Sequence, residues 1–193
     1  MITWLQKALL QFDYTAWYYL NTVWHNAFLD QVIPFVRNQY FWGPLYLFLL
    51  LFMTMNFGKK GWIWCAVFLV TFAMSDYISA SVIKPLFNRT RPCNNPYLQD
   101  ILRLLVPRSS GYSFPSTHAA NHFSLGIFSA VTLGQRHRWV WAAAIGWAVL
   151  VSYGQVYVGV HFPMDIFCGG LLGTGIGLFT GKAYNRKYQL MPA

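Results

Sequence analysis

The feature that most constrains this fold is an uncharged apolar run at residues 38–58, NQYFWGPLYLFLLLFMTMNFG. An α-helix rises about 1.5 Å per residue, so this run is long enough to cross a hydrocarbon core of roughly 30 Å. The rest of the chain has the same character, because 56% of all residues are hydrophobic and only 10% are charged, far below the charged share of a soluble domain. The sequence therefore predicts an integral membrane protein.

Further apolar runs extend this pattern along the chain. Residues 61–87 carry only Asp76 and Lys84 as charged residues, and three more runs follow, at 115–134, 139–158 and 163–180. We expect an all-α integral membrane protein with a bundle of about five transmembrane helices, or six if the N-terminal part also spans. The glycines of the last run predict close packing of that helix against a neighbour.

The N-terminal part is more polar than these runs. Residues 1–37 mix Trp and Tyr with Asp13, His25 and Asp30, which favours helices lying in the membrane interface over a sixth span. The chain start has no clean apolar core before a small-residue cleavage site, so no cleaved signal peptide is predicted. We expect a single domain over 1–193, with interfacial helices at 1–37, the transmembrane bundle at 38–180 and a cytoplasmic tail at 181–193.

Basic residues predict the orientation of the bundle. If five spans alternate, Lys59, Lys60, the QRHR segment at 135–138 and the tail share one face, which the positive-inside rule makes cytoplasmic. The opposite face receives the polar loop 88–114, and a loop of this length is commonly functional.

Charge and cysteine content narrow the class of function. The formal charge is +9 and no glutamate is present, which suits anionic lipids or a phosphorylated substrate. The basic residues lie between apolar runs and form no stripe with interleaved aromatic residues, so nucleic acid is not expected as a partner. The three cysteines, Cys65, Cys93 and Cys168, are an odd number and indicate no disulfide framework.

Three separated segments meet on the outer face in this topology: KPLFNRTRP at 84–92, PSTH at 115–118 and GQVYVGVHFPMD at 154–165. Each is a weak signal alone. Together, in this order, they resemble the type 2 phosphatidic acid phosphatase (PAP2) superfamily, whose pattern is Lys, six residues, Arg-Pro; Pro-Ser-Gly-His; and Ser-Arg, five residues, His, three residues, Asp. The resemblance spans most of the chain and implies a helical membrane phosphatase that needs no metal or other cofactor.

The resemblance also implies roles for individual residues. Lys84 and Arg91 would bind phosphate oxygens, the first as a point charge and the second as a planar fork. His118 would be the general acid that protonates the leaving oxygen. His161 would be the nucleophile that forms a phosphohistidine, and Asp165 would accept the other ring N–H and fix the tautomer.

Ser116 and Thr117 stand where the third long helix should begin. The Ser116 hydroxyl and the backbone N–H groups that follow could cap this helix or hold an anion, and we include both residues among the phosphate-binding candidates. Thr117 replaces the glycine of the superfamily pattern.

Gln155 is the main departure from the pattern, which has arginine there, and Gly154 replaces the serine before it. Glutamine can donate two hydrogens but brings no charge, and losing one such donor typically costs about 3 kcal/mol in barrier. Gln155 therefore allows three alternatives: a slower phosphatase, a site in which Arg89 or Arg108 supplies the charge, or a lipid-phosphate binder without turnover. Because the other pattern residues are present, we favour retained catalysis, and the pattern alone predicts that Gln155→Arg would speed turnover.

For the other polar residues we expect roles in packing or at the membrane surface, outside the catalytic site. We expect Asp76 to contact another helix and His122 to pack beside His118 without binding a metal. Arg103 and Arg108 are read as cations that reach the membrane surface or lipid headgroups, and the role of Arg89 stays undecided.

The sequence thus predicts a metal-independent lipid phosphate phosphatase in the bacterial inner membrane, with its active site facing the periplasm or exterior. Undecaprenyl pyrophosphate, phosphatidylglycerol phosphate and the lipid A 1-phosphate are the substrate classes that the resemblance suggests. Two rivals stay open: a membrane protein that binds lipid phosphates or assists their transport, and a relative of the vanadate-dependent haloperoxidases, which are soluble. The oligomeric state is not predicted.

Overall fold

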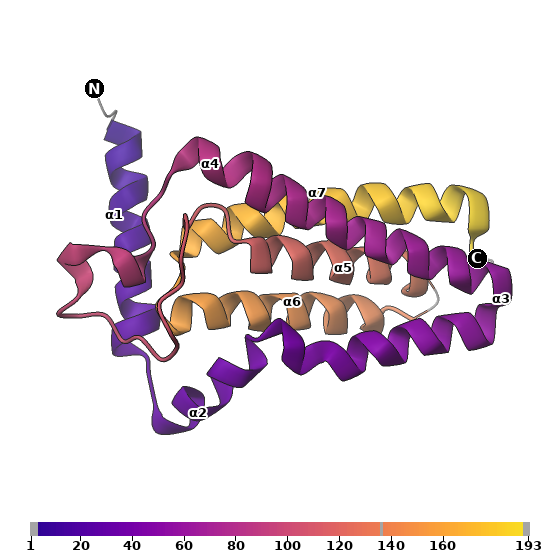
Figure 1. Ribbon diagram of the computed structural model, residues 1–193, viewed down its shortest axis with the longest axis horizontal. Helices are drawn as coiled ribbons and strands as arrows, with labels where there is room; N and C mark the ends of the chain where they lie inside the picture. Colours follow the sequence, from indigo (N-terminus) through magenta and orange to yellow (C-terminus); the bar gives the residue numbers. More distant parts are fainter. Residues whose placement is uncertain (1–3, 136, 191–193) are drawn as a thin grey trace.

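The structure, a computed structural model, describes residues 4–135 and 137–190. Over these residues the regular structure is entirely helical and contains no strand. Long helices lie along one common axis, and shorter helices cover one end of them (Figure 1). The predicted all-α class is confirmed.

The first two predicted spans form one helical hairpin. Helix α3 (Gly43–Asp76) reverses direction at Gly58, whose φ of +51° and ψ of −130° are not helical. A positive φ of this kind suits glycine because it has no Cβ. Just beyond the turn, Gly61 lies against the backbone of Met53 with no room for a Cβ, so the two arms touch closely. Figure 1 shows the turn at the end of the bundle where the C-terminus also lies.

The returning arm of α3 extends beyond Asp76. A π-helical segment, η3 (Tyr77–Ile83), and a single turn, α4 (Lys84–Phe87), continue it. The whole stretch Gln39–Phe87 is 49 residues long and is one of three stretches apolar and long enough to cross a membrane, together with Trp139–Tyr157 and Pro163–Tyr188. Since the first of these folds back on itself, it supplies two of the predicted passes.

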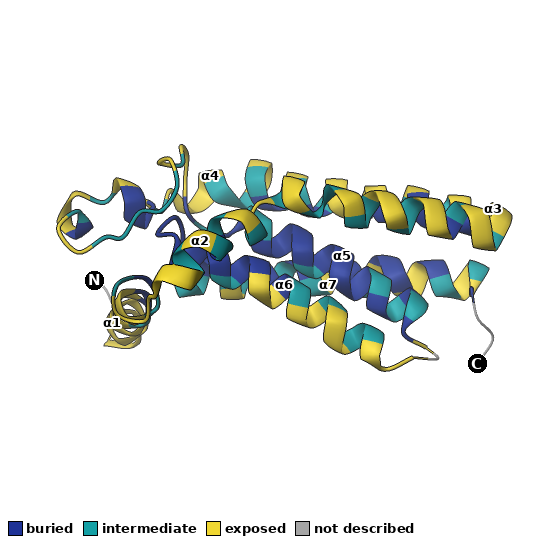
Figure 2. Ribbon diagram, turned by 90° about the horizontal axis from the view of Figure 1, so that it is seen from below, coloured by how far each residue is buried: buried dark blue, intermediate teal, exposed yellow. Residues whose placement is uncertain are grey.

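The second half of the bundle consists of α5 (Thr117–Leu133), α6 (Trp139–Tyr157) and α7 (Pro163–Tyr188). Helix α5 is the most deeply buried and lies among the others (Figure 2). With 17 residues it is short for a span, but its flanking helices shield it from lipid. Helix α7 continues through Tyr188, past residue 180, where the apolar pattern ends.

Glycines bring α7 against α5. A Cβ on Gly173 would meet the backbone of Ala120 and Ser124, and one on Gly177 would meet the backbone around Ser124. This close approach is the packing that small residues permit between helices in a membrane, and it agrees with the glycine pattern of the sequence.

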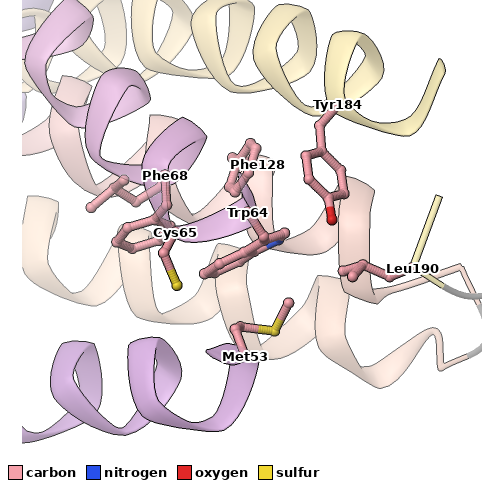
Figure 3. Packing of buried hydrophobic residues seen from close by; sticks show 8 residues of the cluster. Met53, Trp64, Cys65, Phe68, Phe128, Tyr184 and Leu190 are labelled. Atoms are coloured by element: carbon pink, nitrogen blue, oxygen red, sulfur yellow. The ribbon is translucent and has the colours of Figure 1, made fainter. Parts of the chain in front are cut away.

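An aromatic cluster fills the bundle on the side of the Gly58 turn (Figure 3). The rings of Trp64 and Phe68 stack with centroids 5.0 Å apart, and Phe128 of α5 lies 5.2 Å from Trp64. The indole N–H of Trp64 donates to Thr132 Oγ1 at 2.8 Å, so the buried polar group is satisfied. This cluster joins the α3 hairpin to α5 and Tyr184 of α7.

The N-terminal helices cover the opposite end of the bundle. Helix α1 (Trp4–Tyr18) crosses this end and continues as a short π-helix, η1 (Tyr19–Val23), before α2 (Ala27–Val36) and a 3-10 turn, η2 (Gln39–Trp42). Neither α1 nor α2 is among the stretches long and apolar enough to span. Asn21 attaches this region to the bundle by donating to the carbonyl oxygens of Tyr157, at 2.7 Å, and Arg103, at 2.8 Å.

The polar loop between α4 and α5 contains only two 3-10 turns, η4 (Pro92–Asn94) and η5 (Pro96–Leu98). It lies at the same end as α1 (Figure 1). Its Arg103 pairs with Asp30 of α2 at 2.6 Å, and Arg108 donates to the Cys93 carbonyl and to Gln99. Both arginines, expected to reach lipid, therefore bind protein groups.

The basic residues assigned to the cytoplasmic face share the other end of the molecule. Lys60 Nζ donates to the Gln189 carbonyl at 3.0 Å, and the Tyr184 hydroxyl donates to the Lys60 carbonyl at 2.9 Å. The Gly58 turn and the end of α7 are thus in contact. Of the predicted basic segment at 135–138, Arg136 lies outside the described residues, as do residues 191–193 of the tail.

Candidate active site

The three sequence segments lie together at the end of the bundle that α1 and the polar loop cover. Lys84 begins α4, Ser116 and His118 begin α5, and His161 and Asp165 flank the start of α7. The backbone N–H of Ser116 donates to the Asp165 carbonyl at 2.9 Å, which joins the second and third segments directly.

His161 lies in the short turn between α6 and α7 and is 2% exposed. Its Nε2 is 3.0 Å from a terminal nitrogen of Arg91, and its Nδ1 is 3.4 Å from Asp165 Oδ2. A guanidinium can only donate, so Nε2 is the acceptor and Nδ1 carries the ring proton toward the carboxylate. Burial lowers the pKa of His161 to about 4, although the hydrogen bond with Asp165 opposes this shift. The ring is therefore neutral, and the lone pair on Nε2 accepts the hydrogen bond from Arg91.

Asp165 is fully buried and accepts several hydrogen bonds besides the one from His161. The backbone N–H of Phe162 donates to its Oδ2 at 2.8 Å, and Ser113 Oγ donates to the same oxygen at 2.5 Å. Ser113 also lies 3.3 Å from His161 Nδ1, so the hydroxyl, the carboxylate and the ring form one compact group. Ser113 was not predicted from the sequence, because it is two residues before the PSTH segment and belongs to none of the three motifs.

Arg89 connects Asp165 to the N-terminal helix. One of its terminal nitrogens donates to Asp165 Oδ1 at 2.7 Å, and the other pairs with Asp13 of α1. Burial lowers the pKa of Arg89, but the two adjacent carboxylates outweigh this and raise it. Asp13 is 1% exposed and also accepts from the Met164 backbone N–H at 2.8 Å. This role of Asp13 was not predicted from the sequence, because Asp13 lies outside the three motifs.

Arg91 and Lys84 supply positive charge next to His161. Arg91 is held by carbonyl oxygens of Ser110, Gly111 and Val160, at 3.2, 3.3 and 3.2 Å. Burial lowers the pKa of Arg91, which reflects the cost of keeping this cation out of water. Lys84 is half-buried, and its ammonium has no hydrogen-bond partner or ion pair among the described residues.

Ser116 caps α5, and its Oγ accepts from the Ala119 backbone N–H at 3.4 Å. The Thr117 hydroxyl is buried and has no hydrogen-bond partner among the described residues. His118 lies in the first turn of the helix and lines a cavity of about 370 Å³. His118 thus lines this cavity, and the charges of Arg37 and Lys84 act on its ring.

Gln155 is fully buried near the end of α6. Its Nε2 donates to the Arg37 carbonyl at 3.2 Å, and its Oε1 has no partner in the described part of the chain. Arg89 and Arg108, the two residues considered as substitutes for the missing charge, are both bound elsewhere. Arg89 binds Asp165 and Asp13, and Arg108 binds the Cys93 carbonyl and Gln99.

Asp76 and His122 make the helix contacts expected of them. The Asn121 side chain donates to Asp76 Oδ1 at 2.9 Å, which links α5 to α3. His122 Nδ1 faces the His118 carbonyl at 2.8 Å, and its ring lies 4.8 Å from that of Trp147. Within residues 4–135 and 137–190, no group of three or more His, Cys, Asp or Glu side chains lies together as metal ligands would.

This fold and this arrangement of residues belong to a known class of membrane phosphatases. The family model described as "PAP2 superfamily" matches residues 62–189. The match covers most of the chain, so the protein belongs to the PAP2 superfamily and is a phosphoric ester hydrolase.

Individual relatives agree with this assignment. The chain is 32% identical to the lipid A 4'-phosphatase of Bacteroides thetaiotaomicron over 77% of its own length and 67% of the relative. It is 34% identical to the undecaprenyl-diphosphatase of Sulfolobus acidocaldarius, over 74% of its own length and 63% of the relative. The crystal structure of Aquifex aeolicus LpxE superposes with a TM-score of 0.69 at 26% identity, covering 89% of this chain and 95% of that one.

Proposed function

We propose that the protein removes phosphate from a membrane lipid carrying a phosphomonoester or diphosphate, by way of a phosphohistidine at His161. The observation that carries this proposal is the orientation of the His161 ring. Nδ1 faces Asp165, and Nε2 points its lone pair at Arg91, which is where a bound phosphoryl group would be held. A neutral, oriented imidazole next to unneutralised cations is suited to attack phosphorus.

The reaction proceeds in two steps, formation of the phosphohistidine and its hydrolysis. His161 Nε2 forms a bond to phosphorus while the bond from phosphorus to the lipid oxygen breaks, and that oxygen takes its proton from His118. Asp165 stabilises the positive charge that the ring then carries. Water next attacks phosphorus and gives a proton to His118, the bond between phosphorus and Nε2 breaks, and inorganic phosphate leaves. Lys84 and Arg91 balance the charge on the phosphoryl oxygens throughout.

A groove next to the cavity supports a lipid as substrate. This groove, of about 320 Å³, lies between the α3 hairpin and α5 and is lined mainly by apolar side chains such as Leu50, Phe72 and Leu125. Gln39 and Tyr40 line both the groove and the cavity at His118. A phosphorylated headgroup in the cavity can therefore keep its hydrocarbon part in the groove.

Two relatives support a phosphorylated lipid as the substrate class. Their names, lipid A 4'-phosphatase and undecaprenyl-diphosphatase, describe a sugar phosphomonoester and a polyprenyl diphosphate. Both are phosphates attached to large apolar groups, as the groove requires. We place the site on the periplasmic or outer face, because the opposite end carries Lys59, Lys60, Lys182, Arg186 and Lys187.

The test is phosphate release by the purified protein in detergent, with lipid A, undecaprenyl diphosphate and phosphatidylglycerol phosphate as substrates. We expect release from at least one of them and a loss of at least about 1,000-fold in His161→Ala. Brief incubation with a ³²P-labelled substrate should leave acid-labile label on the wild-type protein and none on His161→Ala.

His25→Ala is the matched control, because His25 is exposed and outside the site. Turnover that survives His161→Ala would refute the proposed nucleophile. Tight binding of the phosphorylated lipids without any release would instead favour a lipid-phosphate binder, which the neutral Gln155 makes the second candidate.

A further inference from the structure

Both departures from the superfamily pattern in the third segment touch the same residue, Arg37, which follows α2. A Cβ added to Gly154 would lie 2.7 Å from Arg37 Cβ and 3.3 Å from Ile33 Cγ2. A serine there would push the end of α2 away from α6. Gln155 donates its side-chain N–H to the Arg37 carbonyl at 3.2 Å. One substitution makes room for Arg37, and the other holds its backbone in place.

The guanidinium of Arg37 has no hydrogen bond and no ion pair among the described residues, and its Nε is buried. Burial and the positive charge of Arg91 both lower the pKa of Arg37. A buried cation without a partner is costly unless something negative binds to it. Arg89 and Arg103, by contrast, are both paired with aspartates.

Arg37 lines the cavity of about 370 Å³ that also contains His118, so its side chain reaches the space where the leaving oxygen would lie. Arg91 of the first segment contacts His161 directly. The charge of Lys84 acts on both His118 and His161. Arg37 thus belongs both to this cavity and, through its backbone carbonyl, to the contact with Gln155.

We infer that Arg37 binds the transferring phosphoryl group and replaces, from α2, the arginine that the superfamily pattern places at position 155. This inference rests on the proposed function and extends it by one phosphate-binding residue. Arg37 supplies a planar fork for two phosphoryl oxygens. Gln155 then has a different task, which is to anchor the Arg37 backbone.

A phosphate-binding role for Arg37 changes the effect expected of Gln155→Arg. The pattern alone predicts that Gln155→Arg speeds turnover. With Arg37 in place, a second guanidinium at position 155 would repel the existing cation. We therefore expect Gln155→Arg to slow turnover in the wild-type background and to restore part of it when Arg37 has been removed.

The test compares Arg37→Gln with Arg186→Gln, which makes the same change at an exposed arginine on the opposite end. Arg37→Gln keeps the backbone carbonyl that Gln155 binds, so it removes the guanidinium alone. We expect a loss of about 100- to 1,000-fold in kcat with the lipid that the wild-type protein hydrolyses. Inhibition by orthovanadate, a probe for the phosphoryl site, should weaken in parallel, and Arg186→Gln should change neither.

Two further variants separate a phosphate contact from a structural effect. Arg37→Lys keeps the charge without the fork and should lose less activity than Arg37→Gln. The double variant Arg37→Gln/Gln155→Arg should recover at least about 10-fold over Arg37→Gln, which a mere packing defect would not allow. If Arg37→Gln matches Arg186→Gln in both turnover and orthovanadate inhibition, the inference is overturned while the phosphatase proposal stands. If the wild-type protein releases no phosphate, that proposal fails, and orthovanadate binding still tests Arg37.

Discussion

Arg89 bridges two buried carboxylates, and its removal offers a quantitative test of the site's electrostatics. The Asp13 and Asp165 side chains are 2% and 0% exposed, whereas that of Arg89 is 20% exposed. Breaking a buried ion pair typically costs about 3–5 kcal/mol, because an uncompensated charge stays behind. Since water reaches part of Arg89, we expect Arg89→Gln to cost about 3 kcal/mol, at the lower end of that range. For a chain of this length this corresponds to a fall of about 6–12 °C in Tm.

The control is Arg103→Gln, which breaks a single pair with Asp30 in which both side chains are 24% exposed. A pair open to water to this extent contributes about 1 kcal/mol or less, so its Tm should fall much less. Both variants would be measured by thermal unfolding in one detergent, together with kcat, which should drop in Arg89→Gln because Asp165 loses a hydrogen-bond donor.

A second substitution distinguishes an electrostatic effect of Arg89→Gln from a packing effect. Arg89→Gln leaves two buried carboxylates facing each other, and adding Asp13→Asn removes one of those charges. The double variant should therefore be more stable than Arg89→Gln. If it is less stable by the sum of the two single effects, or if Arg89→Gln and Arg103→Gln have equal Tm values, the electrostatic reasoning is refuted.

Two further predictions concern pH and helix packing. Burial depresses the pKa of His161 from 6.5 to about 4 in the folded protein. Its contribution to stability is therefore complete above pH 6.5 and is lost as the pH falls toward 4. Relative to His161→Asn, the wild-type protein should lose up to about 3 kcal/mol over that interval, and parallel Tm curves for the two proteins would contradict this. Gly173→Ala should destabilise by about 1–3 kcal/mol, because its Cβ would meet the backbone of α5, whereas Gly175→Ala has open space and should be neutral or stabilising. Equal Tm values for the two alanine variants would show that α5 and α7 are not closely packed at Gly173.

The helices were predictable because a membrane span is specified locally. An uninterrupted apolar run of sufficient length satisfies its own backbone hydrogen bonds, so the run at 38–58 and those after it could be read without any knowledge of tertiary structure. The two arms of the α3 hairpin were predicted as separate spans, because a glycine and two lysines at 58–60 interrupt the apolar pattern. The N-terminal helices were predicted to lie at the membrane surface, but their packing over the end of the bundle was not.

The candidate site was predictable only where its residues belong to a recognised spacing. His161 and Asp165 lie four residues apart, and their pairing is a local property of the turn and the first turn of α7. Asp13 contacts Arg89 across 76 residues of sequence, and no local pattern reports a contact of that kind. Ser113 and Arg37 were missed for the same reason. The role proposed for Gln155 depends on its contact with Arg37, and that contact requires the packing of α2 against α6.

Residues that are in contact at the candidate site lie far apart in the sequence. This separation affects the stage of synthesis at which the site can form. Asp13 belongs to the first helix, yet the backbone N–H that it accepts comes from Met164, 151 residues later. Arg89, the third member of this group, is made about midway between them. The ribosome synthesises these residues in order. The carboxylate of α1 and the guanidinium of the polar loop therefore exist before His161, in the turn that precedes α7, and Asp165, in α7, are made. The nascent chain therefore contains most of its membrane helices before the proposed nucleophile is made, and we expect lipid-phosphate hydrolysis only after α7 has inserted.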